Sequence, residues 1–242
     1  MTPSPVAAVI CAAGASARMG GTKKEYRPLP GSPSGLTVLG AAVSAFAAVP
    51  EITTIIITVP NDPGTGEIAA RNALPPQLFE RKSPAIHFVN GGKTRQASVY
   101  NALLSLEASS AGYVLIHDGA RPWVSVSLIN MIIEAAKKHN AAIPLMPLAE
   151  TPKETDVPLD NFMNGINTGS VFVQRHLKRA VIGTAQTPQG FAFPEILAAH
   201  RQAASQNIVC TDDAEIWASV YGPVAVIPGE PENRKITFAE DL

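Results

Sequence analysis

A loop of small residues followed by cations is the stretch of this chain best suited to chemistry. The run Ala12-Ala-Gly-Ala-Ser-Ala-Arg-Met-Gly-Gly21 follows an apolar segment, and Lys23 and Lys24 come just beyond it. Small residues let backbone N–H groups approach a ligand closely, and N–H groups in a loop form a nest for anions. Arg18 and Lys24 add full charges that reach phosphate oxygens. The loop therefore predicts a nucleotide-triphosphate site at the end of a first strand.

This loop lacks the two most familiar phosphate-binding signatures. No Gly-Lys-Ser/Thr closes it, so it is not a Walker loop. Gly14 has no Gly-x-x-Gly spacing after it, so it is not a dinucleotide fingerprint either. The alternative to a triphosphate site is a simple tight turn between a strand and a helix.

A second stretch, Gly91-Gly-Lys-Thr-Arg-Gln-Ala-Ser98, follows an expected strand at 85–89. The two glycines permit a tight turn, and Thr94 is expected to cap the helix that carries Ser98. Gly91 and Gly92 are candidates to lie flat against a base edge, and Ser98 is a candidate nucleotide contact. The alternative is a plain turn between strand and helix with a Thr cap.

The third stretch, His117-Asp-Gly-Ala-Arg-Pro122, comes at the end of another expected strand, at 113–117. Asp118 falls at the carboxyl end of that strand, where α/β sheets place their ligands. A carboxylate there suits Mg²⁺, which binds through one or two carboxylates and substrate phosphates. Arg121 can face the same pocket, or the Asp and Arg can simply pair to close a loop. His117 is expected to pack or hydrogen-bond within the sheet.

Three further stretches complete the set of candidates. They are Gln186-Thr-Pro-Gln-Gly-Phe191, which Arg179 precedes, Thr211-Asp-Asp213 at an expected helix start, and Asn233-Arg-Lys-Ile-Thr237. Thr211 is a good N-cap residue, which is its structural alternative. Lys235 in an exposed tail would ordinarily be a solvated side chain.

Composition narrows the class of protein. With 242 residues, 46% of them hydrophobic, the chain can bury one substantial core, with or without an appendage. Charged residues are 16% and the net charge is −1, so no basic excess points to nucleic acid or to a membrane surface.

Cys11 and Cys210 lie too far apart in sequence to suggest a disulfide framework or a zinc site, which favours a reducing compartment. We expect a cytoplasmic protein, since the residues before Val6 carry no charged side chain of a secretory signal.

Strand-like and helix-like runs alternate along most of the chain. The expected strands cover residues 6–12, 53–59, 85–89, 113–117, 141–145 and 224–227. The expected helices cover residues 37–48, 66–74, 94–106, 127–139, 194–204 and 213–220. This alternation predicts an α/β fold: a Rossmann-like, mostly parallel twisted sheet with helices on both faces.

Residues 148–178 break the alternation. They hold Pro152 and Pro158, several polar residues and no clear period. We expect an arm or long loop with short strands, such as one at 169–173, projecting from a single domain that spans 1–242. A long segment without structure of its own is usually functional or intermolecular.

Taken in order, these pieces resemble one family. The motifs AAGxSxRM, KKEY, GGKTRQAS, HDGARP, QTPQGF, TDDA and NRKITFAEDL are together similar to the 2-C-methyl-D-erythritol 4-phosphate cytidylyltransferases of the non-mevalonate isoprenoid pathway. The resemblance covers residues 6–242. It implies transfer of a cytidylyl group from CTP to 2-C-methyl-D-erythritol 4-phosphate, with pyrophosphate as the second product and Mg²⁺ as cofactor. It also implies a homodimer that exchanges arms, with 148–178 as the dimerisation and active-site arm.

The resemblance also implies roles for individual residues. The nucleotide-binding positions are Ala12, Ala13, Gly14, Arg18, Lys24, Gly91, Gly92 and Ser98. The positions that bind the polyol phosphate are Asp118, Arg121, Thr151, Arg179, Thr187, Thr211 and Lys235. Arg18, Lys24, Arg179 and Lys235 match the catalytic positions, and Asp118 matches the metal position.

Several alternatives stay open at this point. Lys23 competes with Lys24, because Lys23 stands where Pro is common in the family's Pro-Lys-Gln-Tyr-like run. Arg175 competes with Arg179 for the arm position. A ribitol-5-phosphate cytidylyltransferase would use the same CTP site, and a nucleotide-binding homologue without catalysis would keep the fold.

Overall fold

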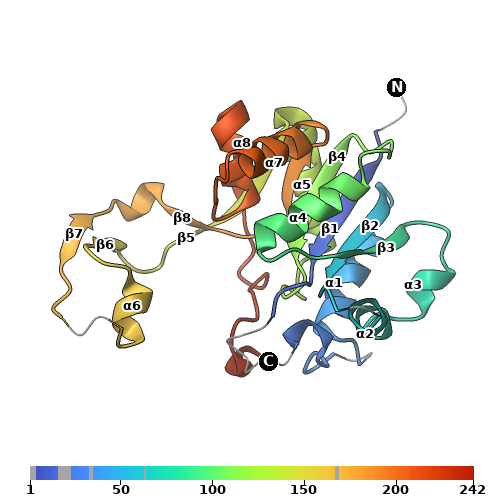
Figure 1. Cartoon of the computed structure of the whole chain (residues 1–242), viewed down its shortest axis with the longest axis horizontal. Coiled ribbons are helices and arrows are strands. Elements are labelled where there is room, and N and C mark those ends of the chain that lie inside the picture. The colour runs from blue at the N-terminus through green and yellow to red at the C-terminus, as the bar shows by residue number, and fades with distance from the viewer. Residues whose placement is uncertain (1–3, 16–22, 33–34, 63, 167–168) are drawn as a thin grey trace. The chain divides into compact units, whose positions relative to one another are not determined.

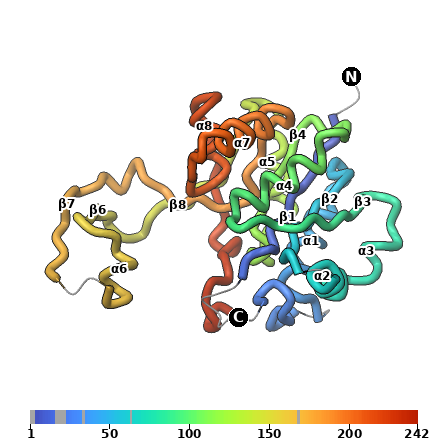
Figure 2. Tube along the Cα trace, in the orientation of Figure 1, coloured from blue at the N-terminus to red at the C-terminus, as the bar shows by residue number. Residues whose placement is uncertain are grey.

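The chain folds into two compact units. The computed structural model describes residues 4–15, 23–32, 35–62, 64–166 and 169–242. The larger unit comprises the described residues up to Pro144 together with Gln186–Leu242, and the smaller unit is Leu145–Ala185 (Figures 1 and 2).

A twisted sheet forms the centre of the larger unit. Its strands lie in the order β10-β5-β9-β4-β1-β2-β3. Their bounds are β1 Val6–Cys11, β2 Ile52–Val59, β3 Ala85–Asn90, β4 Tyr113–Asp118, β5 Ala141–Pro147, β9 Gln189–Ala192 and β10 Ala225–Pro228. β1 pairs in parallel with both β2 and β4, and β2 pairs in parallel with β3. The expected Rossmann-like, mostly parallel α/β sheet is therefore confirmed.

The register brings the chemistry-bearing strand ends to one edge. Cys11 at the end of β1 lies opposite Thr58 of β2 on one side and Asp118 of β4 on the other. Because the strands are parallel, the loops that follow them leave from the same edge. The loops after β1 and β4, which the sequence singled out, thus begin side by side.

β9 is a strand that the sequence analysis did not anticipate. It runs antiparallel between β4 and β5, pairing Leu115 with Gly190 and Ala142 with the same glycine from the other side. Gly190 has no room for a side chain, because a Cβ there would lie 2.6 Å from Cγ2 of Ile132. A four-residue strand with Gln and Gly at its start carries a weak strand signal in sequence.

Helices cover both faces of this sheet. They are α1 Val38–Ala47, α2 Gly66–Asn72, α3 Gln77–Glu80, α4 Arg95–Ser105, α5 Val126–His139, α7 Glu195–Ser205 and α8 Asp213–Tyr221. Val6 and Ile10 pack in one core cluster with apolar residues of α1 and α5. Ala7 and Val9 point to the opposite face and are also fully buried, on the side where α4 packs against β1. The short helix α3 was not expected from the sequence, and no helix of the described residues is long and apolar enough to cross a membrane.

Side-chain caps fix where several helices begin. Thr37 accepts the N–H of Gly40 before α1, Thr94 accepts that of Ala97 before α4, and Ser125 accepts that of Leu128 before α5. Each cap satisfies an N–H that the helix itself leaves unpaired. The expected Thr94 cap is confirmed, and it fixes the direction in which α4 leaves the 91–98 turn.

The smaller unit holds the segment that lacked a period in the sequence. Its elements are β6 Lys153–Thr155, α6 Leu159–Met163, β7 Val173–His176 and β8 Gly183–Ala185. β6 and β7 form an antiparallel pair, and β8 pairs antiparallel with the last residues of β5. The expected strand at 169–173 is wrong, because pairing starts only at Val173. Several large apolar side chains of this unit are exposed: Leu159, Phe162, Met163, Ile166, Phe172, Val173 and Val181.

Candidate active site

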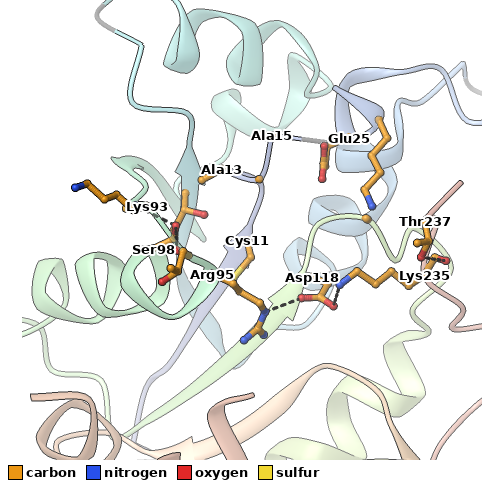
Figure 3. A pocket seen from close by; sticks show the side chains of 16 residues that line it. Cys11, Ala13, Ala15, Glu25, Lys93, Arg95, Ser98, Asp118, Lys235 and Thr237 are labelled. Atoms are coloured by element: carbon orange, nitrogen blue, oxygen red, sulfur yellow. Dashed lines mark hydrogen bonds and ion pairs between the residues drawn. The ribbon is translucent and has the colours of Figure 1, made fainter. Parts of the chain in front are cut away.

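A cavity of about 440 Å³ lies at the carboxyl edge of the sheet in the larger unit (Figure 3). Loops after β1, β3 and β4 line it, and the segment near the C-terminus closes one side. The lining residues are Cys11, Ala13, Gly14, Ala15, Lys24, Glu25, Thr58, Gly92, Lys93, Thr94, Arg95, Ser98, Asp118, Ala120, Lys235 and Thr237. Among these described residues, four side chains are cationic and two are acidic, so the cavity favours an anion.

The loop after β1 enters this cavity as a strip of backbone. The N–H of Ala12 donates to the carbonyl of Thr58 at 3.1 Å and to its hydroxyl at 3.2 Å, which ties the loop to β2. Ala12 itself is buried, whereas Ala13, Gly14 and the residue after them line the cavity. Arg18, the expected cation of this loop, lies outside the described residues.

The two neighbouring lysines occupy different places. Lys24 opens a 3₁₀ turn, lines the cavity and is 8% exposed, and its Nζ donates to the carbonyl of Ile236 at 2.6 Å. Lys23 is not among the lining residues, and its Nζ donates to the carbonyls of Ala12 and Gly14. Of the two candidates that the sequence left open, Lys24 is the one at the cavity.

The 91–98 turn closes upon itself. The Ser98 hydroxyl accepts the N–H of Gly92 at 3.0 Å and donates to the carbonyl of Thr94 at 2.8 Å. Gly92 and Ser98 line the cavity, while Gly91 lies behind it. A Cβ on Gly91 would lie 2.3 Å from Cβ of Ala13, so the two loops approach each other more closely than any other residue type would permit.

Asp118 is surrounded by cations. Its Oδ1 accepts from Nε of Arg95 at 3.1 Å and its Oδ2 from Nζ of Lys235 at 2.9 Å (Figure 3). Nε of Arg121 lies 3.6 Å from Oδ2. Burial alone would raise the pKa of the Asp118 carboxyl, but the three cations hold that pKa well below its usual range. The structure therefore places the ionised Asp118 carboxylate beside two cations that the sequence predicted, Arg121 and Lys235, and one that it did not, Arg95.

Arg95 is the functional candidate that the sequence analysis missed. Besides Asp118, its guanidinium reaches Asp213, with Nη1 2.8 Å from Oδ2. Asp213 is fully buried, and its Oδ1 lies 3.2 Å from Nε2 of His200. Burial would raise the pKa of Asp213, but Arg95 and His200 lower it overall. A cation in the first turn of a helix opposes the helix dipole, which was the available signal that Arg95 has acidic partners.

His117 and Thr187 hold the Asp118 loop from behind. The Thr187 hydroxyl accepts the backbone N–H of Asp118 at 3.1 Å and lies 3.0 Å from Nδ1 of His117. Nε2 of His117 lies 3.2 Å from the carbonyl of Arg121, which can only accept, so Nε2 carries the proton and Nδ1 accepts from Thr187. Burial lowers the pKa of His117 to about 4, which keeps the ring neutral. The expectation that His117 packs or hydrogen-bonds in the sheet is confirmed by its burial in β4, and both of its hydrogen-bond partners lie just outside the strands.

The tail that carries Lys235 is fixed by the same loop. Nη1 of Arg121 donates to the carbonyl of Asn233 at 2.8 Å, and the Asn233 amide donates to the carbonyl of Thr187 at 2.7 Å. These bonds explain how Lys235 reaches a buried carboxylate from a segment that would otherwise be solvated. Lys235 is thus at the cavity, and Arg121 supports it from outside the lining.

Thr211 is not brought to this cavity. It lines a second cavity of about 360 Å³ between α4, α7 and α8, and its hydroxyl donates to the carboxylate of Glu215 at 2.8 Å. The structural alternative, Thr211 as the N-cap, is wrong, because the neighbouring Asp212 caps α8 by accepting the N–H of Glu215.

Two predicted positions belong to the smaller unit. Thr151 precedes β6, and Arg179 opens a 3₁₀ turn and donates from Nη1 to the carbonyl of Ala149 at 2.6 Å. Arg175, the rival of Arg179, forms an ion pair with Glu154 at 2.7 Å. Arg175 therefore already has an anionic partner within its own unit.

Comparison with known proteins agrees with this geometry. The family model for IspD, 2-C-methyl-D-erythritol 4-phosphate cytidylyltransferase, matches residues 6–242. The chain is 40% identical to the enzyme of that name from Pelotomaculum thermopropionicum over 238 residues, covering 98% of this chain and 91% of that protein. It is 38% identical to the bifunctional enzyme IspD/IspF of a Bradyrhizobium species, of which it spans 56%.

Two solved structures of proteins named 2-C-methyl-D-erythritol 4-phosphate cytidylyltransferase share the fold of this chain. The crystal structure from Thermus thermophilus is 31% identical with a TM-score of 0.70, covering 98% of this chain and 95% of that one. The structure from Francisella tularensis is 28% identical with a TM-score of 0.75, covering 98% and 96%. With a family model that matches almost the whole chain and a cavity built from its motifs, this chain belongs to the 2-C-methyl-D-erythritol 4-phosphate cytidylyltransferase family.

Proposed function

We propose that this chain transfers the cytidylyl group of CTP to 2-C-methyl-D-erythritol 4-phosphate, giving 4-diphosphocytidyl-2-C-methyl-D-erythritol and pyrophosphate. The observation that carries the proposal is the cavity at the carboxyl edge of the sheet, which is lined by a backbone strip, Lys24, Asp118 and the Lys235 that pairs with Asp118. The family to which the chain belongs supports the choice of both substrates.

The reaction needs positioned charge more than acid–base chemistry. A phosphate oxygen of the polyol attacks the α-phosphorus of CTP, a new P–O bond forms, and the bond to the β-phosphate breaks to release pyrophosphate. The attacking phosphate is already ionised near neutral pH, so no general base is required. The obstacle is repulsion between two polyanions, and aligned cations that neutralise the growing charge lower it.

Different residues of the larger unit are proposed to bind the nucleotide and to neutralise charge. Ala13, Gly14 and Gly92 offer backbone to the nucleotide, and Ser98 holds the 91–98 turn in shape. Lys24 contributes an ammonium within the cavity, where its charge meets the α-phosphate. Arg18 is proposed as its partner on the loop, as the sequence predicts.

A divalent cation at this cavity would share the Asp118 carboxylate with the cations that already contact both of its oxygens. Asp118 offers an ionised carboxylate, and Mg²⁺ typically binds one or two carboxylates together with substrate phosphates. Among the described residues no group of three or more His, Cys, Asp and Glu side chains converges, which fits an ion carried mainly by the triphosphate. Asp118 is the residue that would hold Mg²⁺, and the ion would neutralise phosphate charge there.

We further propose that the smaller unit serves as the arm of a homodimer. Its exposed apolar side chains, which include Met163 at 75% and Ile166 at 73%, form a surface that a second copy would cover. The positions proposed to bind the polyol phosphate are Thr151 and Arg179 in the smaller unit and Thr187, Thr211 and Lys235 in the larger one; of the last three, Lys235 lines the first cavity and Thr211 lines the second. Arm exchange, the dimer and a cytoplasmic location stay predictions.

A substrate-pair assay tests the proposal. Pyrophosphate release is measured with CTP, UTP or ATP against 2-C-methyl-D-erythritol 4-phosphate and ribitol 5-phosphate, with Mg²⁺ present. We expect turnover only with CTP and the methylerythritol substrate. Turnover with ribitol 5-phosphate instead would reassign the substrate, and CTP binding without any pyrophosphate release would make the chain a non-catalytic homologue.

The Lys24→Ala variant refines the assignment. Because its charge acts on the transition state, we expect kcat to fall by about 10²–10³, the loss typical of one preorganised donor, while CTP affinity changes little. An equal loss in kcat and in CTP affinity would contradict the role assigned to Lys24.

A further inference from the structure

The ammonium of Lys23 lies against the backbone of the nucleotide loop. Its Nζ donates to the carbonyl oxygens of Ala12 and Gly14, each at 2.5 Å. The carboxylate of Glu25 lies 3.8 Å away, and the Lys23 side chain is only 18% exposed. The Lys23 ammonium therefore faces the loop backbone, whereas Lys24, whose Nζ donates to the carbonyl of Ile236, lines the cavity.

Holding those two carbonyls fixes the direction of the N–H groups that follow them. In a planar trans peptide the C=O of one residue and the N–H of the next point in opposite directions. Neither the bond from Ala12 to Ala13 nor the bond from Gly14 to Ala15 is among the cis peptides of the described residues. With both carbonyls turned toward Lys23, the N–H groups of Ala13 and Ala15 point to the other side of the loop.

That other side is suited to an anion. Ala13, Gly14 and Ala15 all line the cavity, whereas Lys23 does not (Figure 3 labels the two alanines). Within the described part of the chain, the N–H groups of Ala13 and Ala15 have no hydrogen-bond acceptor. Two free N–H groups that face the same side of a loop are donors suited to an anion.

We propose that Lys23 is a positioning residue for nucleotide binding, which clamps two loop carbonyls so that the Ala13 and Ala15 N–H groups face the triphosphate of CTP. This inference rests on the proposed function, because it takes the triphosphate as the anion. Without the clamp either peptide can rotate and turn a carbonyl oxygen toward the phosphates, which replaces an attraction with a repulsion. Hydrogen bonds from a charged donor are strong enough to decide between these orientations.

Direct binding measurements test the clamp. CTP affinity is measured by calorimetry for wild type, Lys23→Met, Lys23→Arg and Lys23→Gln, with urea unfolding of each. We expect Lys23→Met to weaken CTP binding by about 10- to 100-fold, the loss of charge-assisted bonds expressed as an equilibrium constant. Lys23→Arg, which keeps charged donors, should recover most of that affinity. In turnover assays the KM for CTP should rise while the KM for the polyol phosphate stays near its wild-type value.

Lys137→Met is the matched control. Lys137 is also a partly exposed lysine, at 27%, paired with a carboxylate, but it lies on α5 away from the cavity, so its loss should leave CTP affinity unchanged. If Lys23→Met does not fold, Lys23→Gln decides, because it keeps N–H donors without the charge and should weaken CTP binding by a smaller factor. Amide signals of Ala13 and Ala15 report the orientation directly, and they should shift on CTP addition in wild type but not in Lys23→Met.

Unchanged CTP affinity in folded Lys23→Met, or in folded Lys23→Gln where the Met variant does not fold, would overturn the inference. So would a loss that Lys23→Arg does not recover. Failure of the proposed function looks different: wild type would bind CTP and still release no pyrophosphate with any polyol phosphate.

Discussion

Substituting Gly91 by Ala tests the claim that two loops must touch to build the nucleotide pocket. The new Cβ would lie 2.3 Å from Cβ of Ala13, 2.9 Å from Oγ of Ser98 and 3.2 Å from the carbonyl of Val59. The closest of these atoms belongs to the loop after β1. Since Ala13 lines the cavity, relief of the clash displaces the surface on which the triphosphate is proposed to lie.

The expected size follows from the cost of overpacking. Forcing an extra methyl group into a packed site typically costs about 1–3 kcal/mol. If the bound state must restore the original loop position, CTP affinity falls by a corresponding factor of roughly 5–150. Calorimetric titration with CTP and the KM for CTP in the pyrophosphate assay both measure it.

A double-mutant cycle shows whether the contact with Ala13 is the cause. In Ala13→Gly/Gly91→Ala the 2.3 Å clash is absent, so most of the CTP affinity should return. The coupling energy between the two changes should reach about 1–2 kcal/mol, within the range for residues in contact. The small displacement of Ser98 remains, so recovery should be incomplete.

Gly190→Ala is the control for overpacking as such. A Cβ there would lie 2.6 Å from Cγ2 of Ile132, which packs α5 on β9 away from the cavity. We expect it to lower the free energy of unfolding by about 1–3 kcal/mol without changing CTP affinity. The reasoning would be refuted if Gly91→Ala bound CTP as wild type does, or if Ala13→Gly gave no recovery.

Three further changes have definite expected outcomes. Asp213→Asn removes the carboxylate that Arg95 contacts at 2.8 Å, so the free energy of unfolding in urea should fall by about 2–3 kcal/mol; an unchanged value would mean that the pair contributes nothing. Burial lowers the pKa of His117 to about 4, so the neutral ring contributes about 3 kcal/mol to the free energy of unfolding above pH 6.5. That contribution is lost as the pH falls toward 4. Urea titrations at several pH values should show that loss in wild type and not in His117→Gln. The same dependence of the free energy of unfolding on pH in both proteins would refute the prediction. Arg179→Ala should raise the KM for the polyol phosphate and leave CTP binding intact, whereas Arg175→Ala, which loses only an ion pair within the smaller unit, should change neither.

The fold was predictable where local pattern and burial agree. The β-branched run ending at Val59 and the Thr94 cap specify their strand and helix by themselves, and both lie where the sequence placed them. The sequence did not predict β9, because this strand is stabilised by pairing on both sides, with Leu115 and with Ala142, and its own residues carry little strand preference. The start of β7 was not predicted for a similar reason, because its pairing with β6 lies in a segment whose sequence has no periodicity.

The candidate site was predictable in outline from motif order. Asp118, Lys24 and Lys235 were named from the sequence and do line one cavity. What sequence cannot supply is the partner of each charge. Arg95 meets Asp213 across more than a hundred intervening residues, and only the packing of α4 near α8 brings them together.

The path of the chain between β5 and β9 has a consequence for how such proteins diversify. The chain leaves the larger unit after Pro144 and returns to it at Gln186, whose N–H donates to the Pro144 carbonyl at 2.9 Å. Everything between these residues is an excursion whose two ends are already hydrogen-bonded neighbours. Its length and sequence can therefore drift, or be exchanged between homologues, without altering strand register, since closing a longer loop costs only about 0.6 kcal/mol per doubling. The acceptor binding and subunit pairing that we propose for the smaller unit would thereby be free to evolve while the larger unit stays constant.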